Sequence, residues 1–370
     1  MASRKRPPFR AEHVGSLLRP KALLKAREER ARDAISAEEL RRIEDEAVRE
    51  VVARQEDIGL KAVTDGEFRR IDWFMDFKYS IGGIEKLTET VKVPFRSATG
   101  ATDFEFVAYR VGERMHLDET IFAEDFAFLK SVATKAIPKL TIPSPSMMHY
   151  PAGRGVDRNV YPDWEMFYDD LAAVYRQQIE GLAGLGCTYL QLDDTSLSFL
   201  NDPARRAMLG EGAETQHHRY IKLFNDCIAD RPSDMTVCTH TCRGNYKSAW
   251  MAEGSYDHVA EALFSDLAVD GFFLEYDDER SGGFAPLRFL PKGKMVVLGL
   301  VTTKSGKLES KDDLKRRIDE AAKFAPLEQL CLSPQCGFAS TAEGNLLTID
   351  EQFAKLKLVV ETARDVWGDE

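Results

Sequence analysis

The chain has 370 residues, a formal net charge of −11 at pH 7 and a pI near 5.3, a balance that argues against nucleic acid or an anionic membrane as its main partner. Its 44% hydrophobic and 30% charged residues are typical of a soluble globular protein, and it has neither the apolar core of a secretion signal nor a stretch long enough to span a bilayer. Six cysteines in a chain of this length indicate reduced thiols rather than a disulfide framework, so we expect a cytoplasmic protein.

Eight short apolar runs have the composition of buried parallel strands. Amphipathic helical patterns lie between many of them, and the first opens with Ser36 and Glu39 at the spacing of a capping box. Such alternation predicts an α/β fold. The predicted strands are Glu12–Ser16, Lys61–Thr64, Lys139–Pro143, Thr188–Leu192, Met235–His240, Gly271–Glu275, Met295–Val301 and Leu327–Leu332, and the main predicted helices are Ser36–Gly59, Asp163–Gly186, Thr215–Asp230, Lys311–Phe324 and Ile349–Trp367.

Strands that alternate with helices fit either a closed (β/α)8 TIM barrel or an open doubly wound sheet. Here polar, chemically capable residues follow nearly every predicted strand, as Asp65-Gly-Glu67 follow the second and Asp193-Asp194 the fourth. A doubly wound sheet would concentrate such residues at one crevice, whereas barrel active sites use the carboxyl ends of many strands. We therefore predict a TIM barrel, with residues 1–370 forming a single domain.

The segment from about Val91 to Thr120 breaks this rhythm. Residues 104–111 alternate between polar and apolar side chains, and Gly112-Glu113 stands between two such runs. The pattern predicts a β-hairpin inserted over residues 91–120, with its turn at Gly112. We expect the hairpin either to cover the barrel mouth or to form a subunit contact in a homo-oligomer.

Four residues with metal-binding side chains follow three of the predicted strands. His240 and Cys242 are two positions apart, so on an extended strand end their side chains point the same way. Glu275 ends the next strand, and Cys336 lies in a turn after the last one. Taken singly, each has an ordinary structural interpretation, such as packing for a cysteine or an acidic loop for Glu275. Taken together, they predict a zinc site, and their scatter favours a catalytic site over a structural one. We interpret the other cysteines as packing residues: Cys187, Cys227, Cys238 and Cys331.

The predicted ligand set also indicates a class of reaction. Zinc with two thiolate ligands is a mild Lewis acid that can bind an incoming thiol and lower its pKa. A thiolate held in this way remains nucleophilic toward an alkyl group. The set therefore favours S-alkylation over hydrolysis.

At these positions the chain resembles the catalytic C-terminal half of the cobalamin-independent methionine synthase family. The resemblance implies zinc at the four residues above and transfer of a methyl group, from a methyltetrahydrofolate, to the sulfur of homocysteine. It covers most of the chain and is closest to the shorter, single-barrel members. The matching stretches are His13-Val-Gly-Ser16, Thr64-Asp-Gly-Glu67, Tyr189-Leu-Gln-Leu-Asp193-Asp194, His240-Thr-Cys242, Phe273-Leu-Glu275 and Ser333-Pro-Gln-Cys336-Gly337.

The same resemblance implies that the amino-acid part of homocysteine binds at Ser16, Glu67 and Asp193. Two carboxylates can pair with an ammonium group, and a Gly-Ser turn offers donors to a carboxylate. Structural alternatives stay open, because Asp193-Asp194 can instead cap a helix and Gly15-Ser16 can be only a turn.

Two departures from the family pattern concern the methyl donor. The family's proton-donating histidine after the seventh strand is absent, and Lys304 stands nearby. The tryptophan that stacks on the pterin after the third strand also has no match, and His149 lies in that loop. We therefore take Lys304 and His149 as candidate proton donors, with a structural role as the alternative for His149. Trp73 and Phe74 belong to a basic-aromatic loop that can face a donor or pack a helix against the barrel.

Three other functions remain open at this point. A thiol alkyltransferase of the epoxyalkane–coenzyme M type would keep the zinc ligands but has no ammonium to pair with Glu67 and Asp193. A barrel of the uroporphyrinogen decarboxylase type would need no metal, and a binding protein would hold zinc without turnover. The sequence does not fix the methyl donor, its glutamate-tail length, the acceptor thiol or the oligomeric state.

Overall fold

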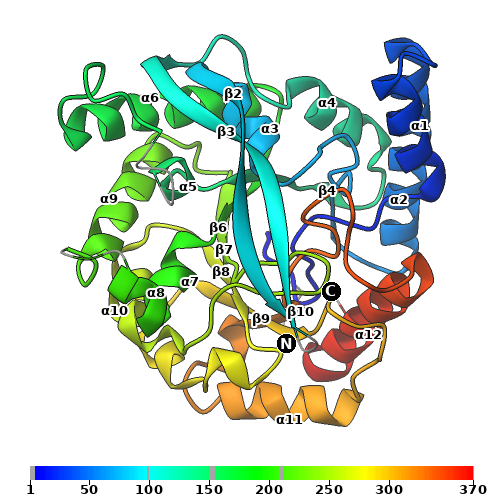
Figure 1. Cartoon of the computed structure of the whole chain (residues 1–370). Helices are drawn as coiled ribbons and strands as arrows, with labels where there is room; N and C mark the ends of the chain where they lie inside the picture. The colour runs from blue at the N-terminus through cyan, green and yellow to red at the C-terminus, as the bar shows by residue number, and fades with distance from the viewer. Residues whose placement is uncertain (1–4, 98–99, 150–154, 209, 211, 370) are drawn as a thin grey trace.

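A six-stranded parallel sheet forms the centre of the molecule, in the strand order β10-β9-β8-β7-β6-β5. The computed structural model describes residues 5–97, 100–149, 155–208, 210 and 212–369. Every residue of these six strands is buried, because helices cover the outside of the sheet and side chains fill the inside (Figure 1). The strands are β5 (Leu140–Pro143), β6 (Tyr189–Asp194), β7 (Thr236–Thr241), β8 (Gly271–Glu275), β9 (Met295–Val301) and β10 (Leu330–Pro334).

Two shorter stretches extend the sheet at its edges. β1 (Ala62–Val63) pairs in parallel with β4 (Ile137–Pro138), which leads directly into β5. At the other edge, Ala11 forms a parallel bridge to Leu332 of β10. The N-terminal segment also reaches β1, since Thr64 Oγ1 donates to the Gly15 carbonyl at 2.6 Å and Leu17 N donates to the Gly66 carbonyl at 3.0 Å. The predicted α/β class is confirmed, although no strand ladder joins the N-terminal segment to β1 among the described residues.

Three predicted strands differ most from the structure, and the other five match it within two residues at each end. Glu12–Ser16 is not a strand, because Gly15 has φ of 151° and the Thr64 side chain takes the carbonyl that a ladder would use. Lys61–Thr64 shortens to Ala62–Val63. In the last run, Pro326 precedes a 3-10 turn at η4 (Leu327–Gln329), so β10 begins only at Leu330.

The helices lie around the sheet (Figure 1). All five main predicted helices are present, with shifts at their ends. These are α2 (Ala37–Asp57), α6 (Trp164–Gly184), α9 (Gln216–Ile228), α11 (Lys311–Ala321) and α12 (Ile349–Trp367). Shorter helices are α1 (Lys21–Ala31), α3 (Met75–Tyr79), α4 (Ala123–Val132), α5 (Ser146–His149), α7 (Ser196–Asn201), α8 (Pro203–Met208) and α10 (Ala260–Asp266), with 3-10 turns at η1 (Tyr256–His258), η2 (Glu279–Ser281) and η3 (Ala285–Phe289). None of the helices described combines the length and apolar character needed to cross a membrane.

The predicted capping box at the start of α2 is only half formed. Ser36 Oγ accepts a hydrogen bond from Glu39 N at 3.0 Å, but the Glu39 carboxylate binds Arg42 instead of returning the bond. A complete capping box occurs at α12, where Thr348 Oγ1 accepts from Glu351 N and the Glu351 carboxylate accepts from Thr348 N.

The inserted hairpin is confirmed, but its predicted boundaries and turn are wrong. Its strands are β2 (Gly82–Ser97) and β3 (Gly100–His116), and residues 98 and 99 between them lie outside the described residues. Gly112 lies inside β3 near a register shift, where a Cβ atom would come within 2.6 Å of Glu85 Oε1. This glycine therefore marks an irregular, closely packed stretch of the ribbon rather than a turn.

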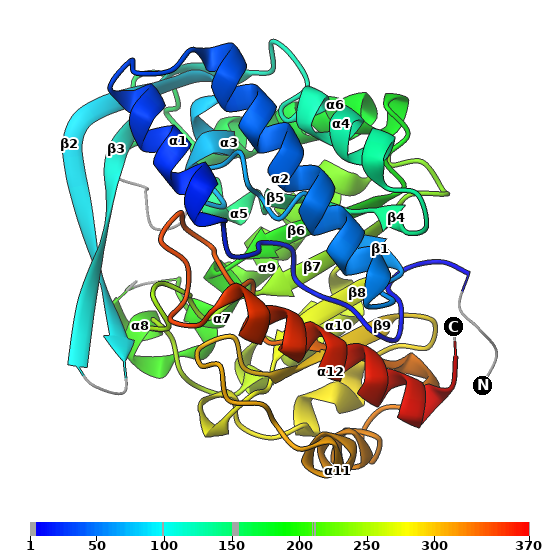
Figure 2. The same cartoon turned by 90° about the vertical axis from the view of Figure 1, so that its right-hand side faces the viewer.

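The hairpin crosses one end of the sheet. Figure 1 shows β2 and β3 in front of the central strands, and Figure 2 shows them along one side of the molecule, with the end of α12 on the opposite side. Residues of both hairpin strands line the pocket described below, so the hairpin covers that end of the sheet.

We expect Thr348→Ala to lower the free energy of unfolding by about 1 kcal/mol, because it removes the hydroxyl that satisfies a backbone N–H at the start of α12. Thr215→Ala is the matched control, since Thr215 precedes α9 without making a side-chain cap. Urea unfolding of the three proteins measures both changes. Equal losses in the two variants would contradict the role given to the capping box.

Candidate metal centre and adjoining pocket

The alternation of side chains along the strands determines which residues of the candidate site face the interior of the sheet. Cys238, Phe273 and Cys331 belong to the cluster of side chains packed inside the sheet, whereas Val237, Phe272 and Leu332 belong to the cluster on its outside. Side chains two positions apart on a strand point to the same face. His240 and Glu275 lie two residues after Cys238 and Phe273, so they face the interior one step closer to the carboxyl end.

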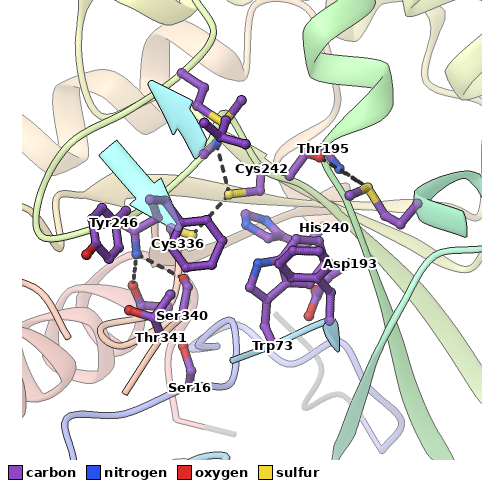
Figure 3. Close-up of a pocket in the computed structure, with 18 of the residues that line it drawn as sticks. Ser16, Trp73, Asp193, Thr195, His240, Cys242, Tyr246, Cys336, Ser340 and Thr341 are labelled. Carbon is purple, nitrogen blue, oxygen red and sulfur yellow. Dashed lines mark hydrogen bonds between the residues drawn. The ribbon is translucent and has the colours of Figure 1, made fainter. Parts of the chain in front are cut away.

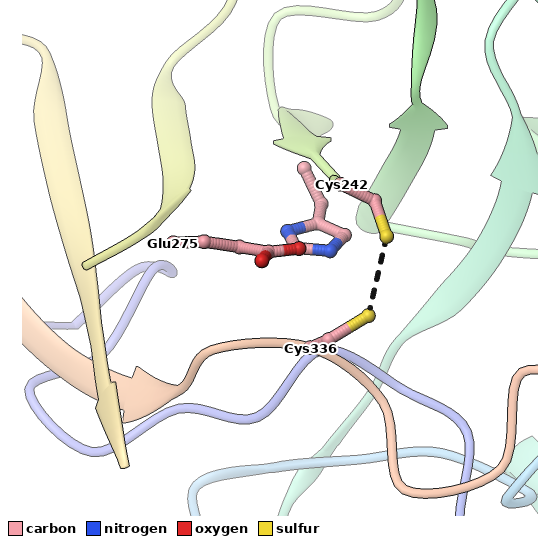
Figure 4. A group of neighbouring side chains, drawn as sticks. Cys242, Glu275 and Cys336 are labelled. Carbon is pink, nitrogen blue, oxygen red and sulfur yellow. Dashed lines mark hydrogen bonds between the residues drawn. The ribbon is translucent and has the colours of Figure 1, made fainter. Parts of the chain in front are cut away.

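The structure brings the four predicted metal ligands together. Their ligand atoms all lie within 4.8 Å of one another, and all four residues are buried. Cys242 Sγ and Cys336 Sγ are 3.4 Å apart although the residues are 94 positions apart in sequence (Figure 4). Gly244 N also donates to Cys242 Sγ at 3.3 Å, which orients the sulfur.

Two buried atoms of this group have no hydrogen-bond partner. His240 Nδ1 lies 3.3 Å from the Phe273 carbonyl, and because a carbonyl only accepts, Nδ1 carries the hydrogen. His240 Nε2 has no such partner. Glu275 Oε1 accepts from Arg243 N at 2.9 Å, while Glu275 Oε2 is unpaired. Each side chain is thus fixed by one atom and offers the other, an arrangement typical of a metal ligand with its orienting partner.

The electrostatics of the group also fit a cation. Burial, and then the negative charge at Cys336, raise the pKa of Glu275 to about 7. Burial works against the charged form of His240, but interactions with Cys336, Asp193 and Glu275 outweigh it and raise the His240 pKa to about 9. The hydrogen bond from Cys242 lowers the pKa of Cys336 and raises that of Cys242. The raised pKa values of His240, Cys242 and Glu275 mean that these three buried groups tend to hold protons, and a divalent cation can take the protons' place. Two sulfurs, an imidazole and a carboxylate fit zinc.

A pocket of about 930 Å³, open to solvent, adjoins the group (Figure 3). His240, Cys242 and Cys336 line it, together with the predicted substrate residues Ser16, Glu67 and Asp193. One pocket therefore holds both a possible metal centre and the residues expected to bind an amino acid.

Glu67 is held at this pocket in an unusual conformation. Its φ is 58°, and its amide donates to Asp65 Oδ1 at 2.9 Å, so a tight turn after β1 directs the side chain inward. Thr141 Oγ1 donates to Glu67 Oε1 at 2.6 Å, whereas Glu67 Oε2 has no partner. Burial raises the pKa of Glu67, against the attraction of Arg70. The free oxygen suits a cationic ligand.

Asp193 and Asp194 have different roles. Asp194 caps α7 by accepting from Leu197 N at 2.7 Å, so the helix-capping alternative applies to Asp194. Asp193 lines the pocket, and its Oδ1 accepts from Gln191 Nε2 at 2.7 Å. Burial raises the Asp193 pKa to about 7, partly offset by His240.

Ser16 lies next to the turn that carries Cys336. Its carbonyl accepts from Phe338 N at 2.9 Å. A Cβ atom on Gly337 would come within 2.0 Å of Ser16 Oγ, so the absence of a side chain there lets the two loops meet.

Neither predicted proton donor is among the described residues that line the pocket. Lys304 Nζ donates to Asn245 Oδ1 at 3.1 Å and to the Ala249 carbonyl at 3.3 Å. His149 Nδ1 is 2.9 Å from Tyr220 Oη, and its ring packs edge-on against Trp164. Burial, and then the nearby Arg219, lower the His149 pKa to about 4, which leaves little of the protonated ring at neutral pH. The structure therefore gives His149 the environment of a packing residue.

Sequence reasoning missed most of the pocket wall. Trp73 and Phe74 line the pocket, whereas Arg69 of the same loop pairs with Asp45 of α2. Further lining residues, unforeseen in the sequence, include Lys78 of α3, Phe95 of β2, Phe104, Phe106 and Tyr109 of β3, and Asn245 and Tyr246 of the loop after β7. Phe104 and Phe106 alternate with charged residues, a signal that one face of the hairpin is apolar.

Comparisons with known proteins agree with this site. Residues 9–365 match the family described as the cobalamin-independent synthase, catalytic domain. The chain is 46% identical to "Uncharacterized protein YxjH" of Bacillus subtilis, over 98% of this chain and 96% of that protein. It is 26% identical to a methionine synthase of Pyrococcus abyssi, over 94% and 88%. A solved structure, the "Putative Vitamin-B12 Independent Methionine Synthase from Listeria monocytogenes", is 37% identical, covers 99% of this chain and 100% of its own, and has a TM-score of 0.79.

Glu67→Gln is expected to stabilise the protein at pH 8. Because the folded state raises the pKa of Glu67, the folded protein holds its proton more tightly, and stability is lost as pH rises from the unfolded value through the folded one. Glutamine removes that loss, so the gain should be present at pH 8 and shrink toward pH 4. Urea unfolding at the two pH values measures it.

Glu56→Gln is the control with the opposite sign. Glu56 accepts hydrogen bonds from Thr134 and from the amides of Lys135 and Ala136, which outweigh burial and lower its pKa. Its neutralisation should lower the free energy of unfolding at pH 8, because hydrogen bonds to a charged group are stronger than those to a neutral one. A Glu67→Gln protein that is less stable than the parent at pH 8 would contradict the interpretation that the contacts of Glu67 with Arg70 and Thr141 only partly offset its burial.

Proposed function

This chain belongs to the family of the cobalamin-independent synthase catalytic domain, and we propose that it is a zinc-dependent methyltransferase that forms methionine from homocysteine. The observation that carries the proposal is the convergence of His240, Cys242, Glu275 and Cys336, with unpaired ligand atoms, beside a pocket that also holds two carboxyl groups. A thiol-bearing amino acid matches both halves of that arrangement.

The four side chains would hold zinc through His240 Nε2, the two sulfurs and the Glu275 carboxylate. Zinc held there would supply a cationic centre that lowers the pKa of a bound thiol and keeps the thiolate available for alkylation. Lys304 has a supporting electrostatic role in this proposal, because its positive charge favours the ionised forms of Glu275 and Cys336.

The amino-acid part of homocysteine would bind between the N-terminal segment, the turn after β1 and the end of β6. Glu67 and Asp193 would pair with the ammonium group, and the hydroxyl of Ser16 would donate to the carboxylate. Both carboxyl groups have raised pKa values, chiefly because burial disfavours their ionised forms. An ammonium group bound beside them would offset that unfavourable free energy. This pairing favours homocysteine over a sulfonate thiol such as coenzyme M.

A methyltetrahydrofolate is our proposed donor. Support comes from the aromatic wall of the pocket, where Trp73, Phe74 and Phe104 can face a flat ring system. Trp73 in this way offers a stacking surface from the loop after β1, although the sequence has no tryptophan after the third predicted strand.

We also propose that the sheet closes into a (β/α)8 barrel within a single domain. The hydrogen bonds from Thr64 to Gly15 and from Leu17 to Gly66 support closure, because they join the N-terminal segment, itself bridged to β10, to β1. None of the six cysteines, all of them described residues, forms a disulfide, which supports a reducing compartment such as the cytoplasm.

Cys336→Ser tests the proposal. The variant should lose most of its zinc and lower single-turnover methylation of homocysteine by about 100-fold or more, because a hydroxyl is a poor zinc ligand. Cys187→Ser is the matched control, since the Cys187 thiol already donates to the Tyr189 carbonyl and a hydroxyl keeps that bond. Elemental analysis and methionine formation from methyltetrahydrofolate, methylcobalamin and other simple donors provide the readouts.

Each contrary outcome has a distinct meaning. Full zinc and full rate in Cys336→Ser would remove Cys336 from the site. A parent protein that purifies without zinc and cannot take it up would favour a metal-free barrel of the decarboxylase type. Preference for coenzyme M over homocysteine would favour the other class of thiol alkyltransferase, and zinc without product from any donor would leave only binding.

A further inference from the structure

Lys78 is a buried cation at the aromatic end of the pocket. It lies on the short helix α3, is 1% exposed and lines the same pocket as the metal group. Its Nζ lies 4.7 Å from the ring centre of Phe74 and 4.9 Å from that of Tyr109. Its hydrogen bond is a long one, 3.4 Å to Tyr109 Oη.

The other buried lysines have carboxylate partners. Among the described residues, three lysines are buried, and Lys139 pairs with Glu12 at 3.5 Å while Lys355 pairs with Glu309 at 3.0 Å. Lys78 has no ion pair among the described residues. A buried ammonium without a carboxylate costs stability, so it is retained where a ligand or a reaction uses it.

We propose that Lys78 is the proton donor to the leaving group of the methyl donor, and that the aromatic chamber around it takes a donor whose methyl group is carried on a neutral nitrogen. This proposal rests on the methyltransferase function given above. It assigns to Lys78, which lines the pocket, the role of proton donor that the sequence suggested for Lys304 or His149.

Methyl transfer and proton transfer occur together in this step. The electron pair of the homocysteine thiolate forms the new S–C bond as the methyl C–N bond breaks, and the C–N electron pair stays on nitrogen. That nitrogen would leave as an amide anion, which is a poor leaving group, unless it receives a proton. Lys78 Nζ supplies the proton, so the products are methionine and a neutral secondary amine, and water then reprotonates the lysine.

The surroundings of Lys78 suit proton donation near neutral pH. Burial lowers its pKa to about 7, against the attraction of Asp72, and an acid whose pKa lies near the working pH transfers a proton efficiently. The titratable groups that face it are Asp72, on the loop before α3, and Tyr109, on β3. Tyr109 Oη donates to the Met148 carbonyl at 3.3 Å, so its oxygen is free to accept from Lys78. Asp72 Oδ1 is occupied by the amides of Phe74 and Met75.

The test uses the zinc-loaded protein with Lys78→Ala and Lys78→Arg. With methyltetrahydrofolate, both variants should lower the single-turnover rate by about 100-fold or more, the usual contribution of a general acid. Arginine keeps the positive charge but does not release a proton at neutral pH. The comparison therefore separates proton donation from simple binding of an anion. Lys86→Ala is the control, because Lys86 also lies over an aromatic ring, that of Tyr79, but is exposed on the hairpin.

Two further readouts exclude a merely structural role. The parent rate should fall above about pH 7 as Lys78 loses its proton, and this fall should be absent in Lys78→Ala. A small primary alkylamine added to Lys78→Ala should restore part of the rate. Zinc content and homocysteine binding, followed by calorimetry, should be unchanged in both Lys78 variants.

The outcomes separate this inference from the proposed function. Parent-like rates in Lys78→Arg, or a Lys78→Ala protein with reduced rate, an unchanged pH profile and no amine rescue, would overturn proton donation while leaving the methyltransferase function in place. Methylation by methylcobalamin but not by methyltetrahydrofolate would overturn both the neutral-nitrogen donor and the proton transfer from Lys78, while leaving the methyltransferase function in place. No methylation from any donor would overturn both.

Discussion

The register of the parallel sheet is the constraint on which the rest of the site depends. Asp193 of β6 stands beside His240 of β7, and His240 stands beside Phe273 of β8, so the inward-facing rows of neighbouring strands lie side by side. A slip of one residue would turn every inward side chain outward. The packed cluster of Cys238, Phe273 and Cys331 opposes such a slip. A slip would turn these side chains toward the helices and leave the interior of the sheet unfilled.

Three buried carboxyl groups lie at the pocket or in the metal-ligand group beside it. Glu67, Asp193 and Glu275 have raised pKa values, and burial is the first cause in each case. Each therefore costs stability in its ionised form, a cost that binding sites commonly carry. Below the site, by contrast, the buried ion pair of Lys139 and Glu12 is closed by Gln191 and Tyr189, so its polar atoms have partners. By comparison, Glu67 Oε2, His240 Nε2 and Glu275 Oε2 are unpaired atoms at the pocket or in the metal-ligand group beside it, where a ligand can meet them.

The two halves of the pocket come from different parts of the architecture. Strand ends and their turns supply the metal group and the carboxyl groups, whereas the hairpin, α3 and the loop after β7 supply aromatic rings and Lys78 (Figure 3). A hairpin added to a sheet can change without disturbing the register beneath it. In the proposed reaction, the chemistry of the acceptor would therefore be fixed by the core, and the choice of donor would be set by an element outside it.

The residue pattern by itself determined the α/β class, five of the helices and the four side chains of the metal group, because the periods of strand and helix and the chemistry of His, Cys and Glu are local properties. It did not determine the turn of the hairpin, since Gly112 lies inside β3, in a stretch of irregular register that no local pattern records. It also could not place Lys78 or His149, whose roles depend on which rings surround them. Tertiary structure decided those, because burial and unpaired atoms arise only when segments far apart in the chain meet.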